Sequence, residues 1–426
     1  MKKSSIFLIG IFACLAFISP FSIEWALAQK PITIGHVHSI SGPMAMYGKS
    51  CQIAGEIAVE EINKAGGVLG RPLKQITRDD KLSPEVGLRE AKSLVLDEKV
   101  DFLTGTISSA VAQAIAGYCL TEKKLFIINI AQSSRTTEEL GHRYVFRFST
   151  NSYPYHGVPA SFAAQKWGLK KICVSGPDYE WGRVAARDFM EIYKKYIPDA
   201  VVVREVWVPL GTTDFTPYIS TMLGSGAELV QHSFFGGMDL GFTKQAWSMG
   251  LFDKMRVSAS CSGDPETWYE VKKGDPYPKG AVATCRYPYW ALKNPRNKEF
   301  VRKFSEKTKI VPNYGAINQY IIVHTLAEVI KEVGAVNTEK IIDALKGRVI
   351  WAPFDPPLDK IKIRACDQQA MLPTWVGLVD FTSELPFPHV TQITVAADPE
   401  ATYRTCAEIA KIREEAKKAG LRPWEK

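Results

Sequence analysis

Beyond residue 30, the hydrophobic residues of the chain follow two alternating periodicities. Short apolar runs rich in β-branched residues, such as PITIGHVHSI, VDFLTGTI and LFIINI, predict β-strands. Between these runs, apolar residues recur at helical spacing over residues 50–65, where Gly66 and Gly67 end the helix, and over residues 84–98 and 109–123. This alternation of strand and helix predicts a parallel sheet covered by helices.

A turn-rich segment, STNSYPYHG at residues 149–157, separates this series from a second one. The second series begins with a helix and continues with the apolar runs KICVSG, VVVREVWV, ELVQHSFF and MRVSAS, with a helix predicted over residues 183–196. Two series of the same kind predict two α/β lobes. From GAVATCRYPYW onward, the pattern changes to a strand and two long helices, and then to short strands, prolines and a basic terminal helix.

The N-terminal segment differs in composition from the rest of the chain. Lys2 and Lys3 precede the apolar run IFLIGIFACLAFI, and the small-residue sequence ALA stands before Gln29. This order is typical of a secretory signal peptide, here over residues 1–28, and the apolar run is short for a membrane span. A lipid anchor at Cys14 is the alternative, and the position of this cysteine inside the apolar run argues against it.

Composition and charge narrow the function classes. A chain of 426 residues, 46% of them hydrophobic and 23% charged, is typical of a soluble globular protein. The net charge of +8 is spread along the chain, so we expect no nucleic-acid partner. Of the eight cysteines, only Cys14 lies in the N-terminal segment, and the odd number that follows it leaves at least one unpaired in an oxidising compartment. Cys51, Cys119 and Cys173 lie in apolar patterns and are expected in the core.

The sequence lacks the usual motifs of enzymes and metal sites. It contains no phosphate-binding loop, no Gly-x-Ser-x-Gly elbow, no Cys-x-x-Cys pair and no His-Glu-x-x-His helix. His36 and His38 share one face of a predicted strand, as a metal pair does, but no further ligand stands at motif spacing. We therefore expect no cofactor and no metal, and a secreted α/β hydrolase is the weaker alternative.

Two serines stand where a strand ends and a helix begins in TGTISSAVAQAI. A serine at this position caps a helix, because its oxygen accepts a hydrogen bond from the first turn. A helix N-terminus with nearby hydroxyl groups also binds anions such as a carboxylate. The residues alone leave both interpretations of Ser108 and Ser109 open.

Several longer stretches together carry a family resemblance. They are SISGPMAMYGKSCQIAGEIAVEEINKAGGVLGRPLK, GTISSAVAQAIA, PDYEWGRVAARDF, TTDFTPYI, FFGGMDLGFTKQAWSMGL and ACDQQAMLPTWVGLV. Taken together, these stretches make the chain resemble the branched-chain amino acid type of extracytoplasmic solute-binding proteins, which serve ABC importers. The resemblance covers residue 31 to about residue 390.

The resemblance implies the type I periplasmic-binding fold. Two Rossmann-like α/β lobes with parallel central sheets are joined by three crossovers, here near residues 149, 288 and 352. The N-terminal lobe is then residues 30–149 with 288–352, and the C-terminal lobe residues 150–287 with 353–426.

The resemblance also implies which residues contact the ligand. Hydroxyl groups and a backbone group of the first lobe hold a carboxylate, and these positions align with Ser108, Ser109, Ala131 and Ser133. Aromatic side chains from both lobes flank the ligand body, and they align with Tyr47 and Trp181.

On the second lobe the chain departs from the family pattern. Amino acid binders place an acid against the ligand ammonium at the strand end that aligns with SASCSGD, where Cys261 and Ser262 now stand. A family tyrosine aligns with Met238, and Asp239 or Asp264 replaces the missing acid only if the loops differ. A buried ammonium without a counter-charge is strongly unfavourable. We therefore expect a carboxylate ligand with an apolar or aromatic body.

The remaining implications concern the cysteines and the partners. The resemblance implies that Cys366 pairs with Cys406, and Cys261 with Cys285 is the alternative. It implies a monomeric, non-enzymatic periplasmic receptor that closes on a small-molecule ligand by hinge motion and docks on the membrane permease of an ABC transporter. A binder of branched-chain or other amino acids and a periplasmic ligand sensor are the alternatives within the same fold.

Overall fold

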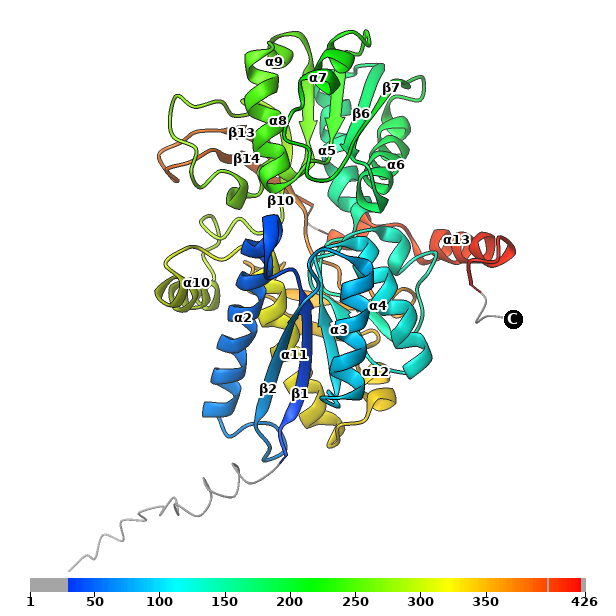
Figure 1. The fold of residues 1–426 in the computed structure, drawn as a ribbon, viewed down its shortest axis with the longest axis vertical. Helices are drawn as coiled ribbons and strands as arrows, with labels where there is room; N and C mark the ends of the chain where they lie inside the picture. Colours follow the sequence, from blue (N-terminus) through cyan, green and yellow to red (C-terminus); the bar gives the residue numbers. More distant parts are fainter. Residues whose placement is uncertain (1–29, 397, 423–426) are drawn as a thin grey trace, which may run out of the picture.

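The computed structural model describes residues 30–396 and 398–422, which form two α/β lobes stacked along the long axis of the molecule (Figure 1). The predicted signal peptide and the alternative anchor at Cys14 lie outside the described residues. Within those two ranges, no helix has the length and apolar character required to cross a membrane.

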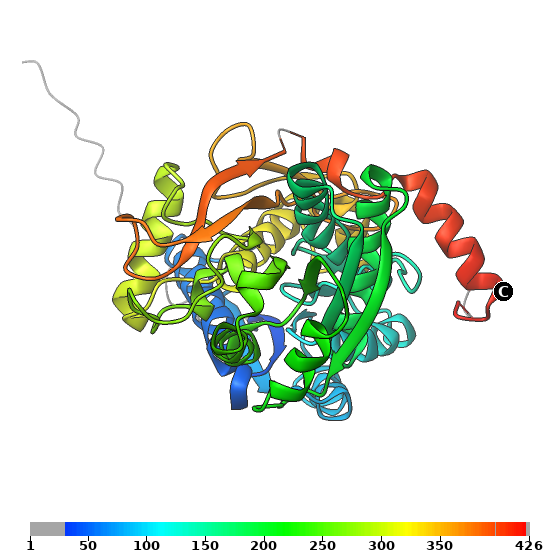
Figure 2. The same cartoon turned by 90° about the horizontal axis from the view of Figure 1, so that it is seen from above.

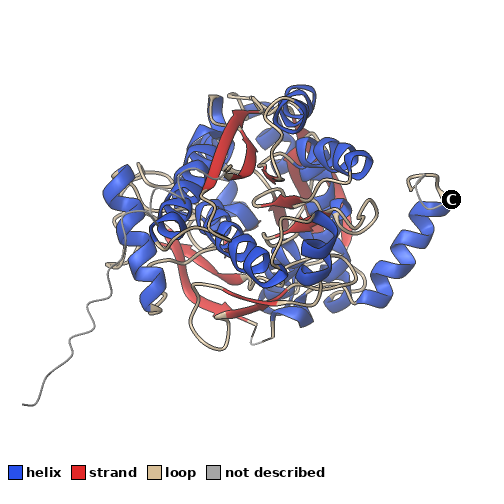
Figure 3. Cartoon of the chain, turned by 90° about the horizontal axis from the view of Figure 1, so that it is seen from below, coloured by secondary structure: helices blue, strands red, loops and turns tan. Residues whose placement is uncertain are grey.

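The first lobe is built on a five-stranded sheet whose strands are all parallel. Its order is β2-β1-β3-β4-β5, from β1 Ile32–His38, β2 Leu73–Asp79, β3 Phe102–Gly105, β4 Phe126–Ile128 and β5 Val145–Arg147. Every residue of β1 is buried, as its continuous apolar run predicts for a strand covered on both faces. Viewed from below, helices surround these strands (Figure 3).

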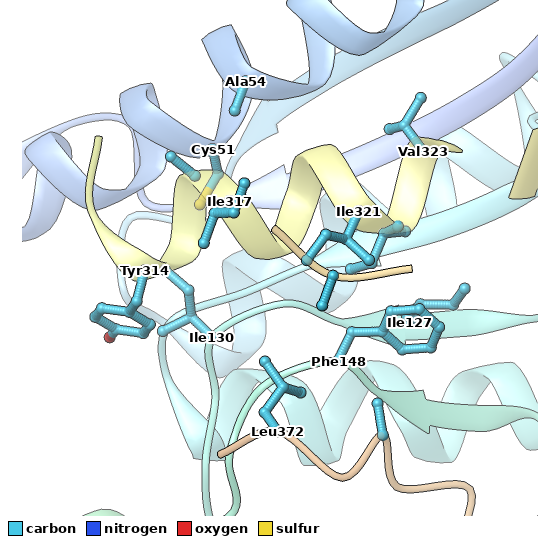
Figure 4. Packing of buried hydrophobic residues seen from close by; sticks show 14 of the residues in the cluster. Cys51, Ala54, Ile127, Ile130, Phe148, Tyr314, Ile317, Ile321, Val323 and Leu372 are labelled. Carbon is cyan, nitrogen blue, oxygen red and sulfur yellow. The ribbon is translucent and has the colours of Figure 1, made fainter. Parts of the chain in front are cut away.

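The helices of the first lobe come from two separate parts of the chain. They are α2 Ala45–Lys64, α3 Pro84–Leu96, α4 Ser109–Glu122, α10 Pro295–Thr308, α11 Tyr314–Val333 and α12 Thr338–Leu345, with the short 3-10 turns η1 Gly42–Met44 and η2 Ser134–Thr136. Figure 4 shows α11 between α2, which carries Cys51, and the strand side of the core, which carries Ile127 and Phe148. A Cβ atom on Gly315 would lie 2.3 Å from the Ile130 side chain, so glycine permits this close packing.

The second lobe contains a seven-stranded sheet in which the strand next to one edge, β13, pairs antiparallel with both of its neighbours; this sheet is visible from above in Figure 2. Its order is β14-β13-β10-β9-β8-β6-β7, from β6 Lys171–Pro177, β7 Val201–Val208, β8 Leu229–His232, β9 Arg256–Ala259, β10 Val282–Cys285, β13 Trp375–Asp380 and β14 His389–Val395. Its helical elements are α5 Ser152–Trp167, α6 Glu180–Tyr196, α7 Thr216–Leu223, α8 Gly236–Ser248, α9 Leu251–Lys254, η3 Ser260–Gly263 and η4 Pro265–Thr267.

The segment that was expected to be turn-rich contains the start of α5 instead. Asn151 caps this helix, because its side-chain oxygen accepts from the backbone N–H of Tyr153 at 3.0 Å. Pro154 is the third helical residue, where the missing N–H removes no intrahelical hydrogen bond. The turn-forming residues of STNSYPYHG therefore act as a helix start, and the expectation of a loop over all of residues 149–157 is wrong.

The C-terminal part of the chain contacts both lobes. It includes the hairpin of β11 Val349–Trp351 and β12 Lys360–Lys362, the turn η5 Pro399–Thr402 and helix α13 Cys406–Lys418, which projects to the right in Figure 1. A disulfide joins Cys366 to Cys406, and the other described cysteines are buried and unpaired. The Arg404 guanidinium donates to Glu138 Oε2 of the first lobe at 2.7 Å. It also donates to Asp188 Oδ1 of α6, in the second lobe, at 3.0 Å.

Candidate functional site

A narrow cleft lies between the two lobes, at the carboxyl ends of their strands. This edge is where ligands bind in open α/β sheets. The first lobe contributes Tyr47, Ile107, Ser109, Ile130, Gln132 and Tyr314. The second lobe contributes Tyr179, Trp181, Phe235, Cys261 and Arg286.

The two serines at the start of α4 have different roles. Ser108 is the N-cap, and its hydroxyl oxygen accepts from the backbone N–H of Val111 at 3.4 Å. Ser109 is the first helical residue and lines the cleft, where its hydroxyl oxygen accepts from the backbone N–H of Ser133 at 3.2 Å. The first N–H groups of a helix lack intrahelical partners and favour an anion. Ser108 thus caps the helix, while its neighbour Ser109 faces the cleft.

The other two residues expected on the anion side, Ala131 and Ser133, lie behind the cleft wall. The backbone N–H of Ala131 donates to the carbonyl of Thr106 at 2.8 Å, within the first lobe. The Ser133 hydroxyl donates to Glu180 Oε1 of α6 at 2.8 Å, and Ser133 is fully buried. Both residues therefore support the cleft wall, and the cleft lining includes neither.

Aromatic side chains form most of the remaining wall. Tyr47 projects from α2, with its ring centre 6.0 Å from that of Tyr314. Trp181 lies in the first turn of α6, and its indole N–H donates to the carbonyl of Ser233 at 3.1 Å. This hydrogen bond fixes the indole plane in the cleft and satisfies its polar edge.

The start of α6 lies unusually close to the end of β6. A Cβ atom on Gly182 would lie 2.1 Å from the carbonyl oxygen of Pro177, so only glycine allows this approach. The close approach places the two residues before Gly182, Glu180 and Trp181, at the boundary between the lobes.

Among the described residues that line the cleft, Arg286 is the charged one, and no sequence pattern predicted it there. It follows β10, and its Nη1 donates to Gln132 Oε1 of the first lobe at 2.8 Å. Its guanidinium carbon lies 3.3 Å from the ring centre of Tyr314 and 4.6 Å from that of Tyr155. An arginine next to the apolar strand VATC was the available signal, because a charge there needs a partner.

Asp264 compensates the charge of Arg286. Its Oδ2 accepts from Arg286 Nε at 2.9 Å and from the Tyr155 hydroxyl at 2.9 Å, and Oδ1 accepts from the Arg286 backbone N–H at 3.0 Å. The carboxylate that was considered as an ammonium partner is therefore occupied within the second lobe. Removal of either partner would leave an uncompensated buried charge.

Two further acids of the second lobe are buried and form no ion pair with any residue that the structure describes. Burial raises the pKa of Asp239 to about 7, although the hydrogen bond that Ser262 donates at 2.7 Å lowers it. Burial, with the neighbouring charge of Asp264, raises the pKa of Glu266 above its usual range. Met238 and Asp239 both lie on α8, and the cleft lining includes neither.

The two histidines of β1 belong to the core. Both are buried, their ring centres lie 5.3 Å apart, and His36 Nδ1 lies 3.0 Å from the hydroxyl of Thr104. Burial lowers the pKa of His38 to about 3, so this side chain is neutral. Over the described part of the chain, no group of three or more His, Cys, Asp or Glu residues is arranged to hold a metal ion.

Comparison with known proteins shows which family has this architecture. The family model for periplasmic binding proteins matches residues 31–384. A leucine-, isoleucine-, valine-, threonine- and alanine-binding protein of Pseudomonas aeruginosa is 28% identical over 358 residues, covering 83% of this chain and 91% of that protein. Leu/Ile/Val-binding protein homolog 6 of Brucella melitensis is 26% identical over 369 residues, covering 84% and 88%.

Two solved structures share the fold. A solute-binding protein of an ABC transporter from Rhodopseudomonas palustris BisB5, in complex with 3,4-dihydroxybenzoic acid, superposes with a TM-score of 0.75 at 21% identity and covers 88% of this chain and 100% of that one. A periplasmic binding protein from Burkholderia mallei superposes with a TM-score of 0.78 at 21% identity, covering 88% and 96%. These similarities confirm the predicted two-lobed α/β fold.

Proposed function

The chain belongs to the periplasmic binding protein family, and on this premise we propose that it binds a small carboxylate with an apolar or aromatic body. As the solute-binding component of an ABC transporter, it works outside the cytoplasm and delivers its ligand to the membrane permease. We propose further that residues 1–28 are a signal peptide that is removed during export.

The observation that carries the ligand proposal is the charge distribution of the cleft. Arg286 is its charged lining residue, and Asp264, Asp239 and Glu266 stand outside the lining. A ligand carboxylate near Arg286 and Ser109 gains charge-assisted hydrogen bonds. A ligand ammonium in the same space meets a cation and no free carboxylate, which is unfavourable when both groups are buried.

The walls suit the rest of such a ligand. Tyr47, Trp181, Phe235 and Tyr314 surround the space with ring faces and edges, which favour offset or edge-to-face contacts with an aromatic ring. The related fold from Rhodopseudomonas palustris was solved with 3,4-dihydroxybenzoic acid, and this agrees with the proposed ligand class.

A branched-chain amino acid is the second candidate ligand. The matched relatives from Pseudomonas aeruginosa and Brucella melitensis are named as proteins that bind leucine, isoleucine and valine. Asp239 is the residue that would serve this candidate, since its buried carboxyl group forms no ion pair with any described residue. The two candidates therefore differ in which side chain of the second lobe contacts the ligand.

We propose that binding closes the lobes about crossovers near residues 149, 288 and 352. In support, β1 to β5 form one sheet and β6 to β10 the other, while α10 and α11 pack with α2 of the first lobe and β13 returns to the second sheet. The lobe bounds that we propose are residues 30–149 with 288–352 and residues 150–287 with 353–426.

Calorimetry on refolded, ligand-free protein tests the ligand class. The titrants are benzoate, 4-hydroxybenzoate, benzamide and leucine. We expect the two carboxylates to bind and benzamide, which keeps the ring but loses the charge, to bind at least tenfold more weakly. Binding of leucine with no response to either aryl carboxylate would show that the amino acid candidate is correct.

A further inference from the structure

One carboxylate of the second lobe accepts hydrogen bonds from three residues of the first lobe. Glu180 is the first residue of α6. Its Oε1 accepts from Gln113 Nε2 of α4 at 3.0 Å and from the Ser133 hydroxyl at 2.8 Å, and its Oε2 accepts from Arg135 Nη1 of η2 at 2.9 Å. All three hydrogen bonds cross the boundary between the lobes.

The position of Glu180 strengthens these three hydrogen bonds, and it allows them to form only when the two lobes are close together. Its side chain is 18% exposed, so water screens the ion pair with Arg135 less than at an open surface. The N-terminus of α6 also favours a negative charge there. If the lobes separate, the three donors leave together, because they belong to one rigid body and the acceptor belongs to the other.

The same contacts connect to the cleft. The backbone N–H of Ser133 donates to the hydroxyl of Ser109 at 3.2 Å, and Ser109 lines the cleft. The residue after Glu180 is Trp181, which lines the cleft from the other lobe. Glu180 itself is not a lining residue: it connects to Ser109 of one wall through Ser133 and directly precedes Trp181 of the other.

We propose that Glu180 is a closure latch, a positioning residue that sets how much of the protein is closed and how long a ligand stays bound. The proposal rests on the proposed function in one respect, that the lobes close on a ligand. It assigns no ligand contact to Glu180, so the latch acts equally on every ligand that the closed form encloses. Loss of the latch lowers the closed fraction and weakens apparent affinity by the same factor.

The first test compares Glu180→Gln with Asp178→Asn. Asp178 lies two residues earlier, and its carboxylate pairs with Arg183 of the same lobe, so this variant removes a charge near the start of α6 without touching the first lobe. We expect Glu180→Gln to raise the dissociation constant about tenfold for each ligand that binds the wild type, by faster dissociation. We expect Asp178→Asn to change it less than twofold.

Comparison between ligands separates a latch from a ligand contact. Stopped-flow tryptophan fluorescence with benzoate, 4-hydroxybenzoate and leucine gives the factor for each ligand that binds. A common factor supports the latch, and factors that differ more than threefold between ligands overturn it, because they indicate direct contact. If only leucine binds, the proposed ligand class fails, while the ratio of the two proteins for leucine still decides the latch.

The second test needs no ligand. Leu96 of α3 and Val201 of β7 are exposed, and the unpaired cysteines of the described chain are buried, so Leu96→Cys and Val201→Cys provide one dye site on each lobe. Single-molecule energy transfer then reports the closed fraction in unliganded protein. We expect Glu180→Gln to lower that fraction severalfold relative to wild type and Asp178→Asn. Equal distributions in all three proteins would overturn the latch.

Discussion

The guanidinium carbon of Arg286 lies 3.3 Å from the ring centre of Tyr314, with the arginine on the second lobe and the tyrosine at the start of α11 on the first. Cation–π contact, the hydrogen bond to Gln132 and the pair with Asp264 together hold the guanidinium at the cleft. The planar guanidinium still has N–H groups that do not donate to these partners. These free N–H groups can donate to a carboxylate.

Substitution of Arg286 should separate binding from stability. Arg286→Met removes the cation and leaves Asp264 buried alone, which costs about 3–5 kcal/mol of unfolding free energy. The double variant Asp264→Asn with Arg286→Met removes both charges and should recover most of that stability. We expect benzoate binding to stay at least a hundredfold weaker in the double variant, by calorimetry. Affinity like that of the wild type in the double variant would show that Arg286 does not contact the ligand.

The two serines at the start of α4 should respond differently. Ser108→Ala removes the N-cap and should lower the free energy of unfolding by about 1 kcal/mol, with less than threefold change in affinity. Ser109→Ala should weaken carboxylate binding about tenfold, and it should also lower the free energy of unfolding by about 1–3 kcal/mol, because the buried Ser133 N–H loses its acceptor. Urea unfolding and calorimetry on both variants check this prediction, and it is wrong if Ser108→Ala is the variant that loses binding.

Asp239 should make stability depend on pH. Its pKa in the folded protein is about 7, above the unfolded value, so the folded state binds the proton more tightly. Its contribution is therefore most favourable below the unfolded pKa and declines as pH rises from about 4 to about 7. We expect Asp239→Asn to gain up to about 3 kcal/mol relative to the wild type between pH 4.5 and pH 8, measured by urea unfolding.

The same variant distinguishes the ligand candidates. Aryl carboxylate affinity should change less than threefold in Asp239→Asn, because the side chain lies outside the cleft lining. If Asp239 instead pairs with a ligand ammonium, leucine binding would be lost and the proposed ligand class would be wrong.

The disulfide between Cys366 and Cys406 should stabilise the C-terminal segment. The two residues are 40 positions apart, and the chain-entropy model gives about 4 kcal/mol for a loop of that length. We expect the double variant Cys366→Ser with Cys406→Ser to unfold at lower temperature, with the midpoint of the wild type falling to the same value under reducing conditions. A wild-type midpoint that does not respond to reductant would contradict this expectation.

Much of the fold could be predicted from sequence because the signals are local. The apolar run of β1 and the helical spacing of α2 follow from the burial each element needs, and these elements occupy the expected segments within a few residues. Tyr47, Ser109 and Trp181 were also expected at a cleft, and the structure places all three in its lining. Three-residue β5, in contrast, is too short to show a periodicity.

What only the tertiary structure decided is which polar groups meet. Arg286 and Gln132 are 154 positions apart, and Ser133 and Glu180 are 47 apart, and neither pair has a spacing that a local pattern detects. Ser133 was expected to face a ligand, yet its hydroxyl donates to Glu180, because the facing lobe brings a charged acceptor within reach. Hydrophobic periodicity determined the elements and their order along this chain. The partners of buried charges depended on how the two lobes face each other, since only packing in three dimensions places one charge beside another.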